Sequence, residues 1–186
     1  VNQIYGAPTN FSPALLVIAT ALFAFQIYGD FSGYTDMARG AAQVMGFKLT
    51  RNFKQPYHAQ SIADFWKRWH MSLSNWFRDY VYVPLGGNKV AIRRFYMNIL
   101  IVFLLSGLWH GASWTFIIWG AIHGVYIVVS HVTANIRHVF AQTTGILNAP
   151  SFHKLLKIIT TFLLVTFAWI FFRADTFTDA LYIAAH

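Results

Sequence analysis

The chain of 186 residues contains no cysteine and no glutamate, and only 11% of its residues are charged. The absence of cysteine excludes thiol nucleophiles, thiolate zinc sites and disulfide bonds. All six acidic residues are aspartates, so a general base must be a histidine or one of these aspartates. Ordinary soluble domains carry about 25% charged residues, whereas here 56% of the residues are hydrophobic. The composition therefore predicts an integral membrane protein.

Long apolar runs predict the membrane helices. The run 11–28 contains no charged residue, and its 18 residues suffice to cross an apolar layer of about 30 Å. The run 155–172 predicts a further span, closed by Arg173, whose side chain reaches the membrane interface. The chain begins with Val1 and shows no signal peptide, so we expect residues 1–186 to be an internal part of a longer protein.

The apolar stretch 95–132 is too long for one crossing. Its 38 residues would form a helix of about 57 Å at about 1.5 Å per residue. Gly107 with Gly111 offers one break and Gly120 with Gly124 offers another, and each choice leaves one piece too short to span alone. The pattern predicts an all-α, polytopic membrane protein with a discontinuous or re-entrant helix, whose irregular backbone faces protein or a water-filled cavity.

Basic residues are concentrated between the first span and the 95–132 stretch. Ten of the fourteen Lys and Arg residues lie in 39–94, where only Asp64 and Asp79 oppose them. The positive-inside rule places this segment on the cytoplasmic side, and the net charge of +8 reflects topology and contact with anionic lipid rather than nucleic-acid binding. The segment either contacts a phosphate-bearing cytoplasmic donor or forms a solvated or lipid-facing surface, which is the more frequent case.

Residues 61–64 match a capping box, which begins a helix that we expect to run to about Tyr80. Apolar and aromatic residues recur along it at spacings of three and four, at positions 65, 69, 73, 76 and 80. This pattern predicts an amphipathic helix in the plane of the membrane interface. His70 lies within this helix, and spacing alone favours an interfacial position for it over a catalytic one.

His110 lies in the apolar stretch, next to Trp109 and near Trp114. Ionisable groups within membrane spans are rare and usually line a polar pathway or a reaction site. The alternative is a histidine that forms a hydrogen bond between helices, and position alone does not separate the two. In a continuous helix Ser106 and Ser113 would share the face of His110 and orient its ring. No H-x-x-x-H pair is present, so the sequence predicts no metal site.

Eight motifs occur in an order that resembles the membrane-bound O-acyltransferase (MBOAT) family. They are Asp30–Ala38, Asn52-Phe53, Pro56-Tyr57, Phe65–Ser74, Trp76–Tyr80, Pro84–Gly87, Gly107–Ala112 and Trp169–Ala174. The last three are similar to the bacterial alginate O-acetyltransferase branch, and the Pro-Leu-Gly-Gly motif differs from the related D-alanyl transfer branch. Because known members are longer, the resemblance implies that residues 1–186 are a central to later part of the membrane domain, with both ends missing.

The resemblance implies roles for particular residues. His110 of the Trp-His-Gly motif would be the catalytic residue, and His70 of the Arg-Trp-His motif would be the second functional histidine. Burial among aromatic side chains would keep the imidazole uncharged and ready to accept a proton. Other residues near the two histidines or within the motifs are expected to line the channel or to support it structurally: Trp109, Ser106, Ser113, Trp114, Asp36, Arg78 and Asp79.

The sequence therefore predicts a multi-pass protein of the bacterial inner membrane that transfers an acetyl group to a hydroxyl of an exported polysaccharide, with His110 as general base. The resemblance implies an acetyl-CoA-like donor as substrate, no bound cofactor, and extracytoplasmic partner proteins. Two alternatives remain at this point. One is D-alanyl or other acyl transfer to a cell-wall polymer, and the other is a non-catalytic transporter or scaffold in which His110 conducts protons or bridges helices.

Overall fold

The computed structural model describes all residues 1–186 and contains nine α-helices and no β-strand. The helices are α1 Asn2–Gly6, α2 Pro13–Val44, α3 Ile62–Trp66, α4 Met71–Phe77, α5 Ile92–His110, α6 Trp114–Val132, α7 Ala134–Thr143, α8 Pro150–Arg173 and α9 Phe177–Ala185. Four of them, α2, α5, α6 and α8, are long and apolar enough to cross a membrane. The protein is therefore an all-α, multi-pass membrane protein, as its composition predicts.

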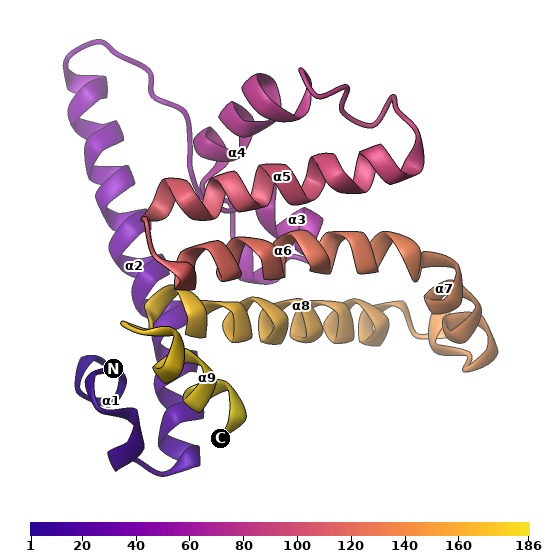
Figure 1. Cartoon of the computed structure of the whole chain (residues 1–186). Helices are drawn as coiled ribbons and strands as arrows, with labels where there is room; N and C mark the ends of the chain where they lie inside the picture. Colours follow the sequence, from indigo (N-terminus) through magenta and orange to yellow (C-terminus); the bar gives the residue numbers. More distant parts are fainter.

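Helices α5, α6 and α8 lie side by side, and α2 runs at a steep angle across one end of the three (Figure 1). The end of α8 contacts α2 there, and the end of α5 and the beginning of α6 lie at the same end of the group. The short helix α3 contacts both α6 and α8, and α4 lines a smaller cavity together with α5. Residues from five separate stretches of the chain are thereby brought to one place.

The predicted interruption of the 95–132 stretch is found at Gly111, where α5 ends and a short turn leads to α6. Each helix has 19 residues, because α5 already begins at Ile92 and includes Arg93 and Arg94. Two membrane-length helices in a hairpin therefore replace the short re-entrant piece that the sequence led us to expect. Long basic side chains extend toward polar surroundings, which allows an apolar helix to include them at its first turn.

Glycines allow α5 and α6 to pack closely. A Cβ atom on Gly120 would collide with the backbone carbonyl oxygen of Phe103, and one on Gly107 would collide with that of Phe116. Small residues that let two backbones approach are the usual basis of helix association in membranes, where lipid is as apolar as the side chains. The two glycines thus set the separation of the hairpin whose turn carries His110.

The segment predicted as one helix from Ser61 to Tyr80 is divided. The helix start at Ser61 is confirmed, because the Asp64 amide donates to Ser61 Oγ at 3.1 Å. The Asp64 carboxylate accepts from the Gln60 amide at 3.1 Å, one residue before the amide that a full capping box would use. Helix α3 ends at Trp66, however, and α4 begins only at Met71, followed by one π-helical turn. The break turns the aromatic residues Phe65 and Trp69 into the protein core, where they are 0% and 4% exposed, instead of toward lipid.

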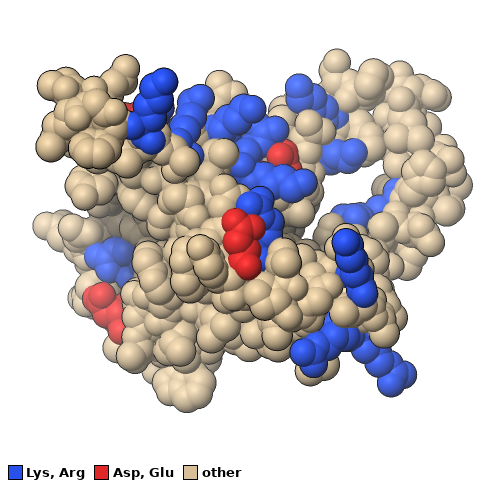
Figure 2. Space-filling model, turned by 90° about the horizontal axis from the view of Figure 1, so that it is seen from above, with Lys and Arg blue, Asp and Glu red and all other residues tan.

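Basic side chains are spread over the surface seen from above the hairpin, with few acidic ones among them (Figure 2). Asp64 and Asp79, the two acids of the basic segment, are each paired with an arginine, Arg68 and Arg78 respectively. The excess of positive charge on this surface therefore remains available to solvent or to anionic groups.

Replacement of Gly120 by alanine is expected to destabilise the hairpin. The new Cβ meets backbone rather than a flexible side chain, and overpacking of this kind costs about 1–3 kcal/mol. The control is Gly40→Ala in α2, where a Cβ meets nothing within 4 Å, so higher helix propensity should stabilise by up to about 1 kcal/mol. Thermal unfolding in detergent should show a lower midpoint for Gly120→Ala only. Equal midpoints for the two variants would contradict the assigned packing.

Candidate active site

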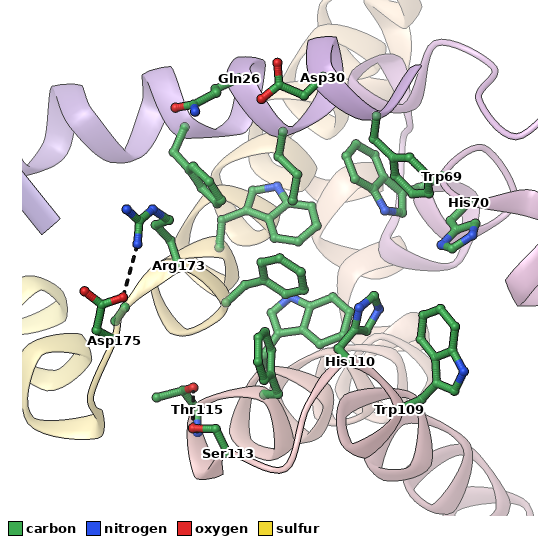
Figure 3. A pocket seen from close by; sticks show the side chains of 18 residues that line it. Gln26, Asp30, Trp69, His70, Trp109, His110, Ser113, Thr115, Arg173 and Asp175 are labelled. Atoms are coloured by element: carbon green, nitrogen blue, oxygen red, sulfur yellow. Dashed lines mark hydrogen bonds and ion pairs between the residues drawn. The ribbon is translucent and has the colours of Figure 1, made fainter. Parts of the chain in front are cut away.

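A cavity of about 740 Å³ lies where the ends of α5, α6 and α8 meet α2 (Figure 3). Its wall is mostly apolar and aromatic, with a few polar side chains. The lining residues are Phe23, Gln26, Ile27, Asp30, Phe31, Trp69, His70, Trp109, His110, Ser113, Thr115, Phe116, Trp119, Trp169, Phe172, Arg173, Ala174 and Asp175. An apolar cavity with a few converging polar groups is the usual form of a small-molecule site.

His110 is the last residue of α5 and its ring faces this cavity (Figure 3). Four aromatic rings surround it, with centroid distances of 5.0 Å to Trp109, 5.1 Å to Trp119, 5.2 Å to Phe172 and 6.3 Å to Phe116. The side chain is half-buried, and no protein group forms a hydrogen bond with the ring. Its nitrogen atoms therefore remain free to bind a molecule in the cavity.

His70 lies in the break between α3 and α4 and lines the same cavity. Its φ angle of 43° is in the left-handed region, which costs a residue with a Cβ about 1–2 kcal/mol. The loop between α2 and α3 holds this conformation. The Lys54 amide donates to the Arg68 carbonyl at 2.9 Å, and the Met71 amide donates to the Asn52 carbonyl at 3.0 Å. Strained backbone of this kind clusters at functional sites.

The surroundings of His70 keep it uncharged. Its ring packs edge-on against Phe31, with centroids 4.7 Å apart, and lies 6.2 Å from the Trp109 ring. Burial, and then the neighbouring His110, lower the pKa of His70 from 6.5 to about 4. At neutral pH the side chain is therefore a neutral imidazole, with one nitrogen that donates and one that accepts a hydrogen bond.

Stacked indole rings form the inner wall of the cavity. The rings of Trp119 and Trp169 lie 5.8 Å apart with an angle of 17° between their planes, and each residue is 1% exposed. Trp69 packs against Trp169 at 5.1 Å. A wall of large, closely packed rings is rigid and gives this side of the cavity an apolar surface.

Two of the predicted supporting residues line the cavity. The Trp109 ring lies 6.2 Å from the His70 ring and 5.0 Å from the His110 ring, and Ser113 caps α6 and contacts Thr115 Oγ1 at 3.0 Å. Ser113 does not share a helical face with His110, because α5 ends at His110 and Ser113 caps α6, whereas Ser106 lies one turn before His110 in the same helix. Ser106 lines a second cavity of about 210 Å³ instead.

The other predicted supporting residues lie away from the main cavity. Trp114 is 73% exposed at the start of α6. Asp36 forms an ion pair with Arg39 at 3.1 Å, on the surface of α2. Arg78 and Asp79 pair with each other at 2.7 Å, and Arg78 lines the smaller cavity with Ser106. Their positions suit structural support rather than contact with a molecule at His110.

Several polar residues that line the cavity were not among the predicted site residues. Arg173, expected to reach the membrane interface, lines the cavity, and it contacts Asp175 Oδ1 at 3.4 Å and Asn2 Oδ1 at 3.0 Å. Gln26 and Asp30 of α2 also line it. Their i, i+4 spacing on an otherwise apolar stretch was a signal that they face one side of the helix together.

His123 is another buried histidine, but it lies outside the cavity. It is 0% exposed, and its Nδ1 accepts a hydrogen bond from Trp66 Nε1 at 3.3 Å. The Trp119 ring separates it from His110, with centroids 5.2 Å from His123 and 5.1 Å from His110. No group of three His, Cys, Asp or Glu side chains is arranged to hold a metal ion.

The chain is similar to known acyltransferases. The model of the family described as MBOAT, membrane-bound O-acyltransferase, matches residues 2–173. A probable alginate O-acetylase AlgI of Pseudomonas aeruginosa is 46% identical over 82% of this chain and 27% of its own length. The peptidoglycan O-acetyltransferase of Helicobacter pylori is 44% identical over 86% of the chain and 29% of its own length.

A teichoic acid D-alanyltransferase of Bacillus subtilis is 32% identical over 83% of the chain and 40% of its own length. The chain thus spans between about a quarter and two fifths of the length of these relatives. The family model covers nearly the whole chain, including both cavity histidines and the ends of α2, α5, α6 and α8. On this evidence the chain belongs to the membrane-bound O-acyltransferase family.

Proposed function

We propose that the protein containing this chain transfers an acetyl group from an acetyl-CoA-like donor to a hydroxyl group of an exported polysaccharide. The observation that carries the proposal is the free imidazole of His110, which lines a cavity of about 740 Å³ together with the second motif histidine, His70. The greater similarity to acetyl-transferring relatives, at 46% and 44% identity against 32% for the D-alanyltransferase, supports acetyl transfer.

In the proposed reaction His110 is the general base. A neutral imidazole removes the proton from the acceptor hydroxyl as its oxygen attacks the carbonyl carbon of the donor thioester. The carbon–sulfur bond then breaks, the new ester keeps the acetyl group, and the thiolate takes up a proton. Such proton transfer typically accelerates a reaction by about 10²–10⁴-fold. The base needs no partner in the protein, because its hydrogen-bond partner is the substrate.

His70 has a complementary role in this proposal. Because its pKa is lowered to about 4, the ring is neutral at pH 7 and offers an N–H group to the cavity. We assign it the task of donating a hydrogen bond to the thioester carbonyl oxygen, where negative charge develops in the transition state. The strained backbone of His70 fixes the direction of this donor before substrate binds.

We place the protein in the bacterial inner membrane and expect it to act with partner proteins. The excess of Lys and Arg in 39–94 favours the bacterial inner membrane with this segment in the cytoplasm, where a phosphate-bearing donor is made. The acceptor would enter from the opposite side, and extracytoplasmic proteins would take part in the transfer to the polymer. The names of the relatives support a polysaccharide or cell-wall polymer as acceptor.

Two other functions are separated by experiment. D-alanyl transfer would use the same general base and is favoured by the relative that acts on teichoic acid. A non-catalytic transporter would need no acyl donor at all. Transfer of radiolabelled acetyl and D-alanyl groups by the intact protein in membrane vesicles distinguishes the three, because only one donor labels polymer in each enzymatic case and neither does in the last.

His110→Gln is expected to lower acetyl transfer by at least 100-fold, because glutamine fills similar space but cannot accept the proton. The control is His138→Gln on the exposed surface of α7, which should transfer at the wild-type rate. Rates are measured in vesicles that contain equal amounts of folded protein, as judged by thermal unfolding. A His110→Gln variant that retains most of the transfer rate would rule out the general-base role.

The His70 imidazole is expected to stay neutral down to about pH 5. Its folded-state pKa of about 4 lies below the unfolded value of 6.5, so protonation favours the unfolded chain and the stability contributed by neutral His70 is lost as pH falls between these values. Histidine-selective NMR in micelles, with the His70 signal assigned by its loss in His70→Gln, measures the titration. A midpoint near 6.5 would contradict the environment described for the ring.

A further inference from the structure

His123 is a titratable residue in the middle of α6 that the proposed reaction does not use. Its side chain is 0% exposed, and a buried polar ring costs free energy unless it is hydrogen-bonded. Its Nδ1 accepts a hydrogen bond from Trp66 Nε1 at 3.3 Å, so the neutral ring carries its hydrogen on Nε2, for which the protein supplies no acceptor. The bond to Trp66 is therefore the one polar interaction of this side chain.

One side of the His123 ring reaches His110 through Trp119. The Trp119 ring meets the His123 ring at 5.2 Å and 75°, and it meets the His110 ring at 5.1 Å and 89°. Both are edge-to-face contacts, which aromatic rings favour at these distances. Trp119 is 1% exposed, and the Trp169 ring is stacked on it. Because closely packed interiors transmit displacements, a shift of His123 would move Trp119 and with it the contact to His110.

The other side of the ring reaches the segment that carries His70. Trp66 is the last residue of α3, and besides donating the hydrogen bond its ring meets the His123 ring at 5.0 Å and 83°. The Phe65 ring stacks on His123 at 6.3 Å, with the two planes 6° apart. The Phe65 carbonyl accepts the Trp69 amide at 2.8 Å, in the turn that leads to His70. His123 thus fixes the end of α3, from which the chain enters the cavity wall.

We infer that His123 is a positioning residue of the acyl-transfer site. By holding Trp66 and Trp119 in place, it keeps the two cavity histidines at their working separation. The inference rests on the proposed acetyl transfer and adds to it a residue that touches neither the donor nor the acceptor, since His123 does not line the cavity. A misplacement of about 1 Å, even one caused by a mutation away from the chemistry, can cost about 100-fold in rate. Loss of the Nδ1 acceptor should therefore lower kcat and leave the KM values for donor and acceptor unchanged.

The test uses the full-length protein in membrane vesicles, with acetyl-CoA as donor. The acceptor is alginate oligosaccharides or peptidoglycan glycan strands, whichever the wild type acetylates. His123→Phe keeps an aromatic ring of similar size but removes the acceptor of the Trp66 N–H group, and we expect kcat per folded protein to fall by about 10- to 100-fold. His123→Asn places a carbonyl oxygen near the position of Nδ1, so it should restore most of kcat.

A second pair of variants tests the same hydrogen bond from its donor side. Trp66→Phe removes the N–H group and should also lower kcat at unchanged KM. Because the two residues act through one interaction, the double variant with His123→Phe should lower kcat little further than either single variant. Effects of the two substitutions that multiply in the double variant would contradict the coupling and overturn the inference.

Asn98→Ala is the matched control. Asn98 is also 0% exposed, lies on α5 of the same hairpin and donates to the Leu85 and Gly87 carbonyls at 3.0 and 3.2 Å, but it lines neither cavity. Its loss should lower the midpoint of thermal unfolding, because two hydrogen bonds are removed, and leave kcat per folded protein unchanged. A His123→Phe variant that behaves in the same way would be a structural loss only, which would overturn the inference and leave the proposed function intact.

The remaining outcomes also decide the question. A raised KM for either substrate at unchanged kcat would overturn the inference, since that result assigns His123 to binding. If His123→Phe does not fold, the decision rests on Trp66→Phe, where a lower kcat at unchanged KM supports the inference and a wild-type kcat overturns it. A wild-type protein that acetylates neither polymer would overturn the proposed function, and the inference with it.

Discussion

The stacked indole rings of Trp119 and Trp169 join α6 to α8 and form the inner wall of the candidate site. Their planes lie 17° apart with centroids separated by 5.8 Å, and both side chains are 1% exposed. Trp119 contacts the ring of His110, and Trp169 contacts Trp69, the residue before His70. The two histidines thus owe their relative positions to one aromatic contact between helices that are distant in sequence. A rigid contact of this kind holds reacting groups in place at little entropic cost on binding.

Close backbone packing complements this contact. Gly107 and Gly120 let α5 and α6 approach until only a glycine fits at either position. His110, at the end of α5, is therefore fixed relative to Trp119 in α6. The loop between α2 and α3 fixes His70 in the same way, by backbone hydrogen bonds from Lys54 to Arg68 and from Met71 to Asn52. Both histidines are held by backbone geometry, which leaves their rings free for ligands.

Residues of the eight sequence motifs have different structural roles. Asn52 holds the His70 turn, and the Tyr57 hydroxyl donates to the Ala24 carbonyl at 2.5 Å, which ties the loop to α2. Asp36 pairs with Arg39 on the surface, whereas Asp30, six residues earlier in the same motif, faces the cavity without a partner. Two acids of one sequence motif therefore have different surroundings, which their positions in the sequence do not reveal.

The sequence by itself determined the membrane class, the all-helical fold and the need for a break within 95–132, because these depend on composition and on local apolar length. It left two positions open for that break, and the structure places it at Gly111. It also singled out His110 and His70, since a histidine in an apolar or motif-rich stretch stands out locally. The division of the 61–80 segment and the separation of Ser113 from the His110 helix depended on contacts with remote residues. Asp30 and Gln26 joined the cavity for the same reason, as the folding of α2 across three helix ends placed them there. A local pattern records which face a residue occupies, but only tertiary packing decides what that face meets.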